Sequence, residues 1–158
     1  MLSFIKFSGV SIAAVWFGGA VFFTFFAAPA FFTAEMKHLL PPPYNGEVAQ
    51  MILQRYYALH YVAGVLALAH LGFEWIYTGR TVQRLTLALV TGTLLLALFG
   101  GLWMHPKLEK LHQMKYAEQY RLTVTPEAKK IATEGFKIWH GISSVMNLVL
   151  LGALGGYL

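Results

Sequence analysis

The chain has 158 residues, of which 57% are hydrophobic and only 12% are charged. Soluble domains carry about a quarter of their residues as charged side chains, so this composition excludes a soluble globular protein and predicts one integral membrane domain, residues 1–158. The absence of cysteine excludes disulfides, thiolate metal sites and the usual iron–sulfur clusters. The net charge of +5 is assigned to membrane topology and anionic headgroups rather than to nucleic acid.

Four long apolar runs predict an all-α, four-helix membrane bundle. The first span covers residues 4–32, and it continues too far to be a cleaved signal peptide. The second span covers residues 56–78 and has aromatic side chains at both ends, as an interfacial belt would have. The third and fourth spans cover residues 85–104 and 138–158.

Polar segments join the spans at one end of the bundle. The proline triplet at 41–43 predicts a polyproline II loop, after which Glu47 starts a helix that extends the second span beyond the membrane. Residues 107–121 have helical apolar spacing and predict a short amphipathic surface helix. The sequence Thr125-Pro126-Glu127 combines a capping hydroxyl, a proline and an acid, so it predicts the start of a helix that extends the fourth span.

Four crossings place both termini on one side of the membrane, which we call side A. The opposite side, side B, carries the polar segments 33–55 and 105–137 and nine of the 12 lysines and arginines. The positive-inside rule then assigns side B to the cytoplasm. The expected location is a bacterial inner membrane. The expected partners are the lipid bilayer and other membrane subunits or a second copy of the chain.

A polar stripe on the fourth span is the first candidate for a site. In a helix, Lys137, His140, Ser144 and Asn147 lie within about 60° of one line. Lipid offers no hydrogen-bond partner, so this stripe must be buried against protein or against a ligand.

His60 and His140 enter from side B and lie at similar depths on the second and fourth spans. The small residue Gly64 shares a face with His60 and leaves room for a flat group. Two neutral imidazoles at matched depth predict a b-type haem between these spans. The expected cofactor-binding residues are His60, His140, Tyr57, Gly64, Lys137, Ser144 and Asn147.

Two alternatives remain open beside this accessory or electron-transfer module. A divalent metal held by His60 and His140 would suit zinc, copper or iron, and would indicate a metal-handling or transport protein. The same side chains would also form interhelical hydrogen bonds in a cofactor-free structural subunit. No nucleophile and base can be paired, so the sequence assigns no catalytic residue and favours no enzyme class.

Several sequence blocks resemble a known family. They are YYALHYVAG around His60, LWMHPKLEKLH, and FKIWHGISSVMNLVLL near the end. With the order of spans and loops, they resemble the transmembrane-protein-205-like family, which includes bacterial members described as a domain of unknown function. The resemblance covers about residues 10–155 and implies four transmembrane helices. The family has no established enzymatic activity that could be carried over to this chain. His105 stands where the family pattern has an acid, so it is left out of the site. The matching positions are His60, Pro106, His140, Gly141, Ser144 and Asn147.

Overall fold

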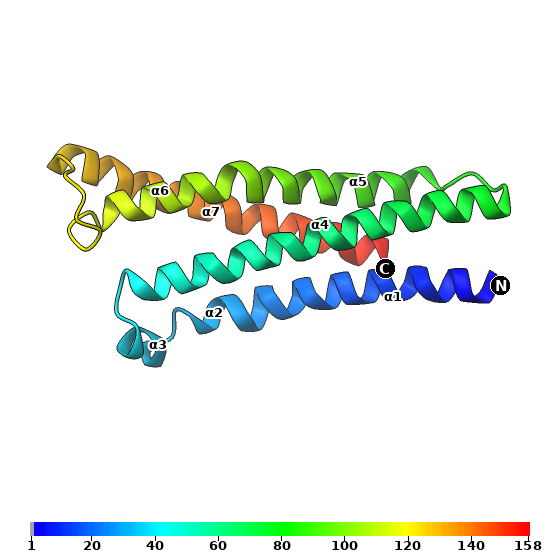
Figure 1. Ribbon diagram of the computed structural model, residues 1–158, viewed down its shortest axis with the longest axis horizontal. Coiled ribbons are helices and arrows are strands. Elements are labelled where there is room, and N and C mark those ends of the chain that lie inside the picture. The colour runs from blue at the N-terminus through cyan, green and yellow to red at the C-terminus, as the bar shows by residue number, and fades with distance from the viewer. Residues whose placement is uncertain (1) are drawn as a thin grey trace.

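A computed structural model describes residues 2–158, and every regular element in that part of the chain is a helix. Four long helical rods lie side by side, and the two termini lie in the same half of the bundle (Figure 1). The prediction of an all-α membrane bundle is therefore confirmed. The rods long and apolar enough to cross a membrane are Ser3–Ala30, Tyr44–Thr78, Arg84–Lys115 and Pro126–Tyr157.

The first rod consists of α1 (Leu2–Phe22), the π-helical segment η1 (Phe23–Ala27) and the short helix α2 (Ala28–Ala30). Pro29 causes this change of helix type. Its ring crowds the carbonyl four residues earlier. The helix does not break there, because one turn takes in an extra residue and becomes π-helical. The backbone N–H of Ala28 accordingly donates to the carbonyl of Phe23, five residues back.

The third rod repeats this arrangement with α5 (Arg84–Phe99), η2 (Gly100–Met104) and α6 (His105–Lys115). The N–H of His105 donates to the carbonyl of Gly100, and Pro106 follows directly. The short amphipathic helix predicted after the third span corresponds to α6, but no break separates it from that span. The end of the span at residue 104 stays a prediction. The π-helical turn accommodates the proline, so α6 continues along the line of α5 (Figure 1).

The connection between the first two rods also differs from the prediction. It contains the helix α3 (Ala34–Leu39), whose cap is the side chain of Thr33. The prolines do not form polyproline II, because Pro43 has φ −87° and ψ −8° and caps the next helix. That helix, α4 (Tyr44–Thr78), begins three residues before Glu47.

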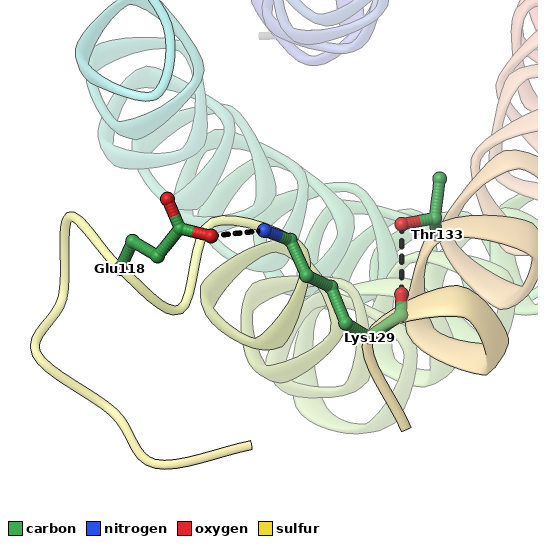
Figure 2. A network of polar contacts seen from close by, with 3 residues as sticks. All are labelled: Glu118, Lys129 and Thr133. Carbon is green, nitrogen blue, oxygen red and sulfur yellow. Dashed lines mark hydrogen bonds and ion pairs between the residues drawn. The ribbon is translucent and has the colours of Figure 1, made fainter. Parts of the chain in front are cut away.

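The last rod, α7 (Pro126–Tyr157), starts where the capping sequence predicted, and the Thr125 hydroxyl accepts from the N–H of Ala128. The Lys129 ammonium binds the Glu118 carboxylate at 2.7 Å, and the Thr133 hydroxyl donates to the Lys129 carbonyl at 2.8 Å (Figure 2). The hydrogen bond and charge of Lys129 lower the pKa of Glu118, so this tie is present at neutral pH and is lost as acid protonates the carboxylate.

Small side chains allow the rods to approach closely in the core. Ala20, Ala67 and Ala97 are fully buried, and they pack with larger side chains such as Val90 and Leu154. Close packing through small residues is typical of helices in membranes. The outer faces carry exposed apolar side chains, as lipid contact requires; examples are Phe26, Val62 and Val145.

Candidate functional site

His60 is fully buried, and its partner is on the first rod. The indole N–H of Trp16 donates to Nδ1 of His60 at 2.6 Å, and Trp16 is also fully buried. The ring of Tyr56 contacts His60 edge-on, with ring centroids 4.3 Å apart. His60 Nε2 is buried and has no hydrogen-bond partner.

This hydrogen bond determines which nitrogen of a neutral His60 carries the proton. An indole N–H only donates, so Nδ1 must be the acceptor and the proton must lie on Nε2. Iron ligation through Nε2 needs the opposite tautomer. The bond to Trp16 and a haem bond through Nε2 therefore exclude one another in this arrangement.

The space proposed for haem is also filled by neighbouring side chains. A Cβ added at Gly64 would lie 2.8 Å from Cδ1 of Leu94, so α5 occupies the side expected for a macrocycle. His140 is exposed, and its ring stacks on Phe136 of its own helix, not on His60. The residues as placed here do not fit a haem, and ligation by His60 and His140 stays a prediction.

The polar stripe on α7 does not converge on one ligand. Lys137 and Ser144 are exposed, and the Ser144 hydroxyl donates to the carbonyl of His140 one turn earlier. Asn147 instead joins three rods. Its Oδ1 accepts from the Tyr56 hydroxyl at 2.7 Å, and its Nδ2 donates to the Thr24 hydroxyl at 2.8 Å. This part of the stripe acts as an interhelical tie.

Three residues predicted to share one site face three different neighbours. Tyr57 contacts the glycines of η2 and lies beside Ser143 of α7, whereas His60 faces α1 and Gly64 faces α5. In the described part of the chain, no three histidine or glutamate side chains converge closely enough to hold a metal ion. The metal site at His60 and His140 stays a prediction.

The structure instead shows a polar cleft at the side-B end, between α4 and the rod formed by η2 and α6. Its volume is about 530 Å³. The wall from α4 follows one face of that helix at helical spacing. This wall consists of Glu47, Gln50, Met51, Gln54, Tyr57 and Tyr61.

The opposite wall is formed mainly by α6. His105 Nε2 donates to the carbonyl of Gln50 at 3.1 Å and fixes α6 to α4. His112 is buried against Gly46, where an added Cβ would lie 2.5 Å from its Nε2, so only glycine permits this approach. The polar members of the wall are His105, Glu109, His112, Gln113 and Tyr120.

The charge of the cleft is opposite to that of its surroundings. Its lining contains Glu47 and Glu109 but no lysine or arginine. Two of the three lysines of α6 instead contact aromatic rings of α7. Lys107 Nζ lies 3.6 Å from the ring centroid of Trp139, and Lys115 Nζ lies 5.3 Å from that of Phe136.

The carboxylates of Glu47 and Glu109 both lie close enough to the Tyr120 hydroxyl to change its pKa. Burial raises the pKa of Tyr120, and so do its hydrogen bond to Glu47 and the negative charges of Glu47 and Glu109. The Tyr120 hydroxyl also lies 3.4 Å from Nδ1 of His112. Both glutamates therefore act on the same outer end of the cleft.

Sequence reasoning identified both segments that form the cleft, but not their contact. The α4 extension and the polar helix after residue 106 were each predicted, and His105 was left out of the site. The missed signal is the spacing of His105, Glu109 and His112, which places them on one helical face opposite Glu47. Pro106 concealed it, because a proline normally ends a helix.

Fold and site together define a small helical membrane protein with an acidic cleft at one end of the bundle. The chain belongs to the family of the domain of unknown function DUF4149, whose model matches residues 11–117, more than half of the chain. This match includes nearly all of the cleft and excludes His140, Ser144 and Asn147. The narrower resemblance to the transmembrane-protein-205-like family stays a prediction. The chain matches no curated protein and no solved structure.

Proposed function

We propose that this protein is a membrane binding module, and that its ligand occupies the cleft between α4 and α6. The observation that supports this proposal is the negative charge of the cleft at the positively charged end of the protein. Side B holds nine of the chain's 12 lysines and arginines, yet the cleft contains two glutamates and neither type of cation. Such a segregation of charge focuses the field on the cleft and favours a cationic ligand.

The dimensions and chemistry of the cleft support the same proposal. Small-molecule sites have volumes of about 300–1,000 Å³ and combine apolar walls with a few placed polar groups. The cleft has a volume of about 530 Å³, and its lining mixes tyrosine rings with carboxylate, amide and imidazole groups. A purely structural subunit would have no need for such an open polar cavity.

Cysteine labelling tests this proposal, because the natural chain has no cysteine. Gln54→Cys and Gln113→Cys place one thiol on each wall of the cleft. In lipid nanodiscs, which expose both membrane faces, we expect a membrane-impermeant maleimide to label both thiols. The matched control is Val145→Cys, at an exposed apolar position of α7 that we expect to face lipid and to stay unlabelled.

The outcome separates the binding module from a cofactor-free structural subunit. Labelling of both wall cysteines, with Val145→Cys unlabelled, supports an aqueous cleft that a ligand can enter. If Gln54→Cys and Gln113→Cys react as slowly as Val145→Cys, the cleft is closed, and the proposal is wrong.

The haem prediction has a separate test. Because Trp16 keeps the proton of His60 on Nε2, we expect the purified protein to show no Soret band. A Soret band with a dithionite-reduced α band, both absent in His60→Ala and His140→Ala, would instead assign electron transfer to this protein. Metal analysis of the same sample tests the alternative of a histidine-bound metal.

A further inference from the structure

We propose that the cleft binds a lipophilic primary amine, with its ammonium group at the outer end and its apolar part at the inner end. This inference rests on the proposed function and names the chemical class of the ligand. It is carried by the way in which charge, hydrogen-bond acceptors and aromatic rings are distributed along the cleft.

The outer end of the cleft is acidic. Glu47 and Glu109 come from opposite walls, and both act on the Tyr120 hydroxyl. Within the described residues, neither carboxylate forms an ion pair with a lysine or arginine. The ion pair observed there joins Lys129 to Glu118 instead. Two carboxylates without a cationic partner favour the binding of a positive group between the walls.

The inner end is aromatic and apolar. Tyr61 lies about 21 Å further along α4 than Glu47, at 1.5 Å per residue. There Tyr57 and Tyr61 meet the backbone of Gly101 in η2, and Leu102 completes the lining. The cleft is therefore amphipathic along its length, as a ligand with a charged head and a hydrocarbon body requires.

The acceptors between the two ends favour an ammonium with N–H bonds. Gln50 and Gln54 line the cleft between its acidic and aromatic ends, and Gln113 lies at the acidic end, one turn beyond Glu109. Their amide oxygens and the glutamate carboxylates accept hydrogen bonds, and a primary ammonium offers three donors. A quaternary ammonium offers none, so it would leave these acceptors unpaired.

Two other cationic ligands fit less well. A bare metal ion would need several convergent ligands, and no three histidine or glutamate side chains converge in the described residues. A phospholipid with an amine headgroup carries a phosphate, which needs a cation beside it. Lys107 and Lys115 are turned toward aromatic rings on the α7 side of α6, so the cleft offers none.

The test uses three probes with the same phenylbutyl body. They are 4-phenylbutylamine, which is protonated at neutral pH, 4-phenylbutanol and 4-phenylbutyrate. We expect calorimetric titration of the full chain in phosphatidylcholine nanodiscs to show binding of the amine at least about tenfold tighter than the alcohol, and no binding of the acid. Empty nanodiscs correct for partition into lipid.

Variants locate the bound amine. Glu47→Gln and Glu109→Gln should each weaken binding of the amine by about tenfold and leave that of the alcohol unchanged. Glu134→Gln is the matched control, because Glu134 is exposed on α7 outside the cleft. Glu109 is itself exposed, so its variant keeps the test valid if Glu47→Gln folds poorly.

Equal affinities for the three probes would contradict the proposal that the ligand is an amine. Labelling of the cleft cysteines would in that case still support the proposed binding module. A loss of amine affinity in Glu134→Gln as large as in Glu109→Gln would show only a general charge effect and would also overturn it. Nanodiscs containing phosphatidylethanolamine test the lipid source. If phosphatidylethanolamine slows the labelling of Gln54→Cys and Gln113→Cys and 4-phenylbutylamine does not bind, the ligand is a lipid headgroup and the free amine is wrong.

Discussion

Trp16 and His60 are both fully buried, and the indole N–H finds its acceptor on the imidazole at a depth where no water is expected. A buried polar group without a partner costs more than a hydrogen bond contributes, so this pair is required as a unit. An ionisable side chain within a span is a functional hypothesis by default. Here the bond from Trp16 gives His60 a structural role and removes the lone pair that a metal would need.

Trp16→Phe should destabilise the protein by about 1–3 kcal/mol, because both nitrogens of His60 are then buried without partners. Thermal unfolding in detergent measures the loss. Trp75→Phe is the control, since Trp75 is 55% exposed. In Trp16→Phe combined with His60→Leu, we expect part of the stability to return. If the double variant loses the sum of the two single losses, the two side chains are not coupled.

Asn147 and Ser144 lie on one stripe of α7 but should respond differently to truncation. Asn147→Ala removes bonds to Tyr56 and Thr24 and should cost about 1 kcal/mol, at about 0.6 kcal/mol for each interhelical bond. Ser144→Ala removes only a bond within its own helix and should be close to neutral. Equal losses in the same unfolding assay would argue against this distinction.

At the level of helices, the two π-helical segments share one cause. Each ends two residues before a proline, at Pro29 in the first rod and at Pro106 in the third. The second segment sets the rotation of α6 about its axis, because one extra residue in a turn rotates the next part of the helix by about 100°. After this rotation the face with His105 and Glu109 is turned toward α4, where His105 donates to the carbonyl of Gln50.

Pro106→Ala tests this link between helix type and cleft. Alanine supplies the missing N–H, so η2 should return to α-helix and turn the wall of α6 away from α4. We expect labelling of Gln113→Cys to change strongly in this background, and binding of 4-phenylbutylamine to be lost. Pro29→Ala alters η1 on the first rod, which contributes no residue to the lining of the cleft, and it should change neither. If the two variants behave alike, proline does not position the cleft.

For the molecule as a whole, the sequence was informative where one physical rule dominated. Hydropathy and length predicted the four spans, and the pattern at Thr125 located the start of α7. Prediction from sequence failed where two physical effects opposed each other. Proline predicted a break at Pro106, but packing of η2 on Tyr57 and Tyr61 favours a continuous helix.

The candidate site was harder to predict. The helix face and the membrane depth of a residue do not determine which neighbouring helix that residue contacts. His60 and His140 enter from the same side at similar depth, yet His60 contacts α1, and His140 is exposed. Helix order in a bundle depends on packing of all four rods, which periodicity within one helix does not contain. The cleft depends on the contact between α4 and α6, where His105 Nε2 lies 3.1 Å from the carbonyl of Gln50.

Protection of the cleft cysteines by 4-phenylbutylamine tests the central claim most directly. Labelling rates of Gln54→Cys and Gln113→Cys are measured in nanodiscs with and without the amine. A ligand between α4 and α6 must shield both walls, so we predict that both rates fall with the same concentration dependence, while 4-phenylbutyrate has no effect. Labelling that is equally fast with and without saturating amine on either wall would contradict a ligand site between these two helices.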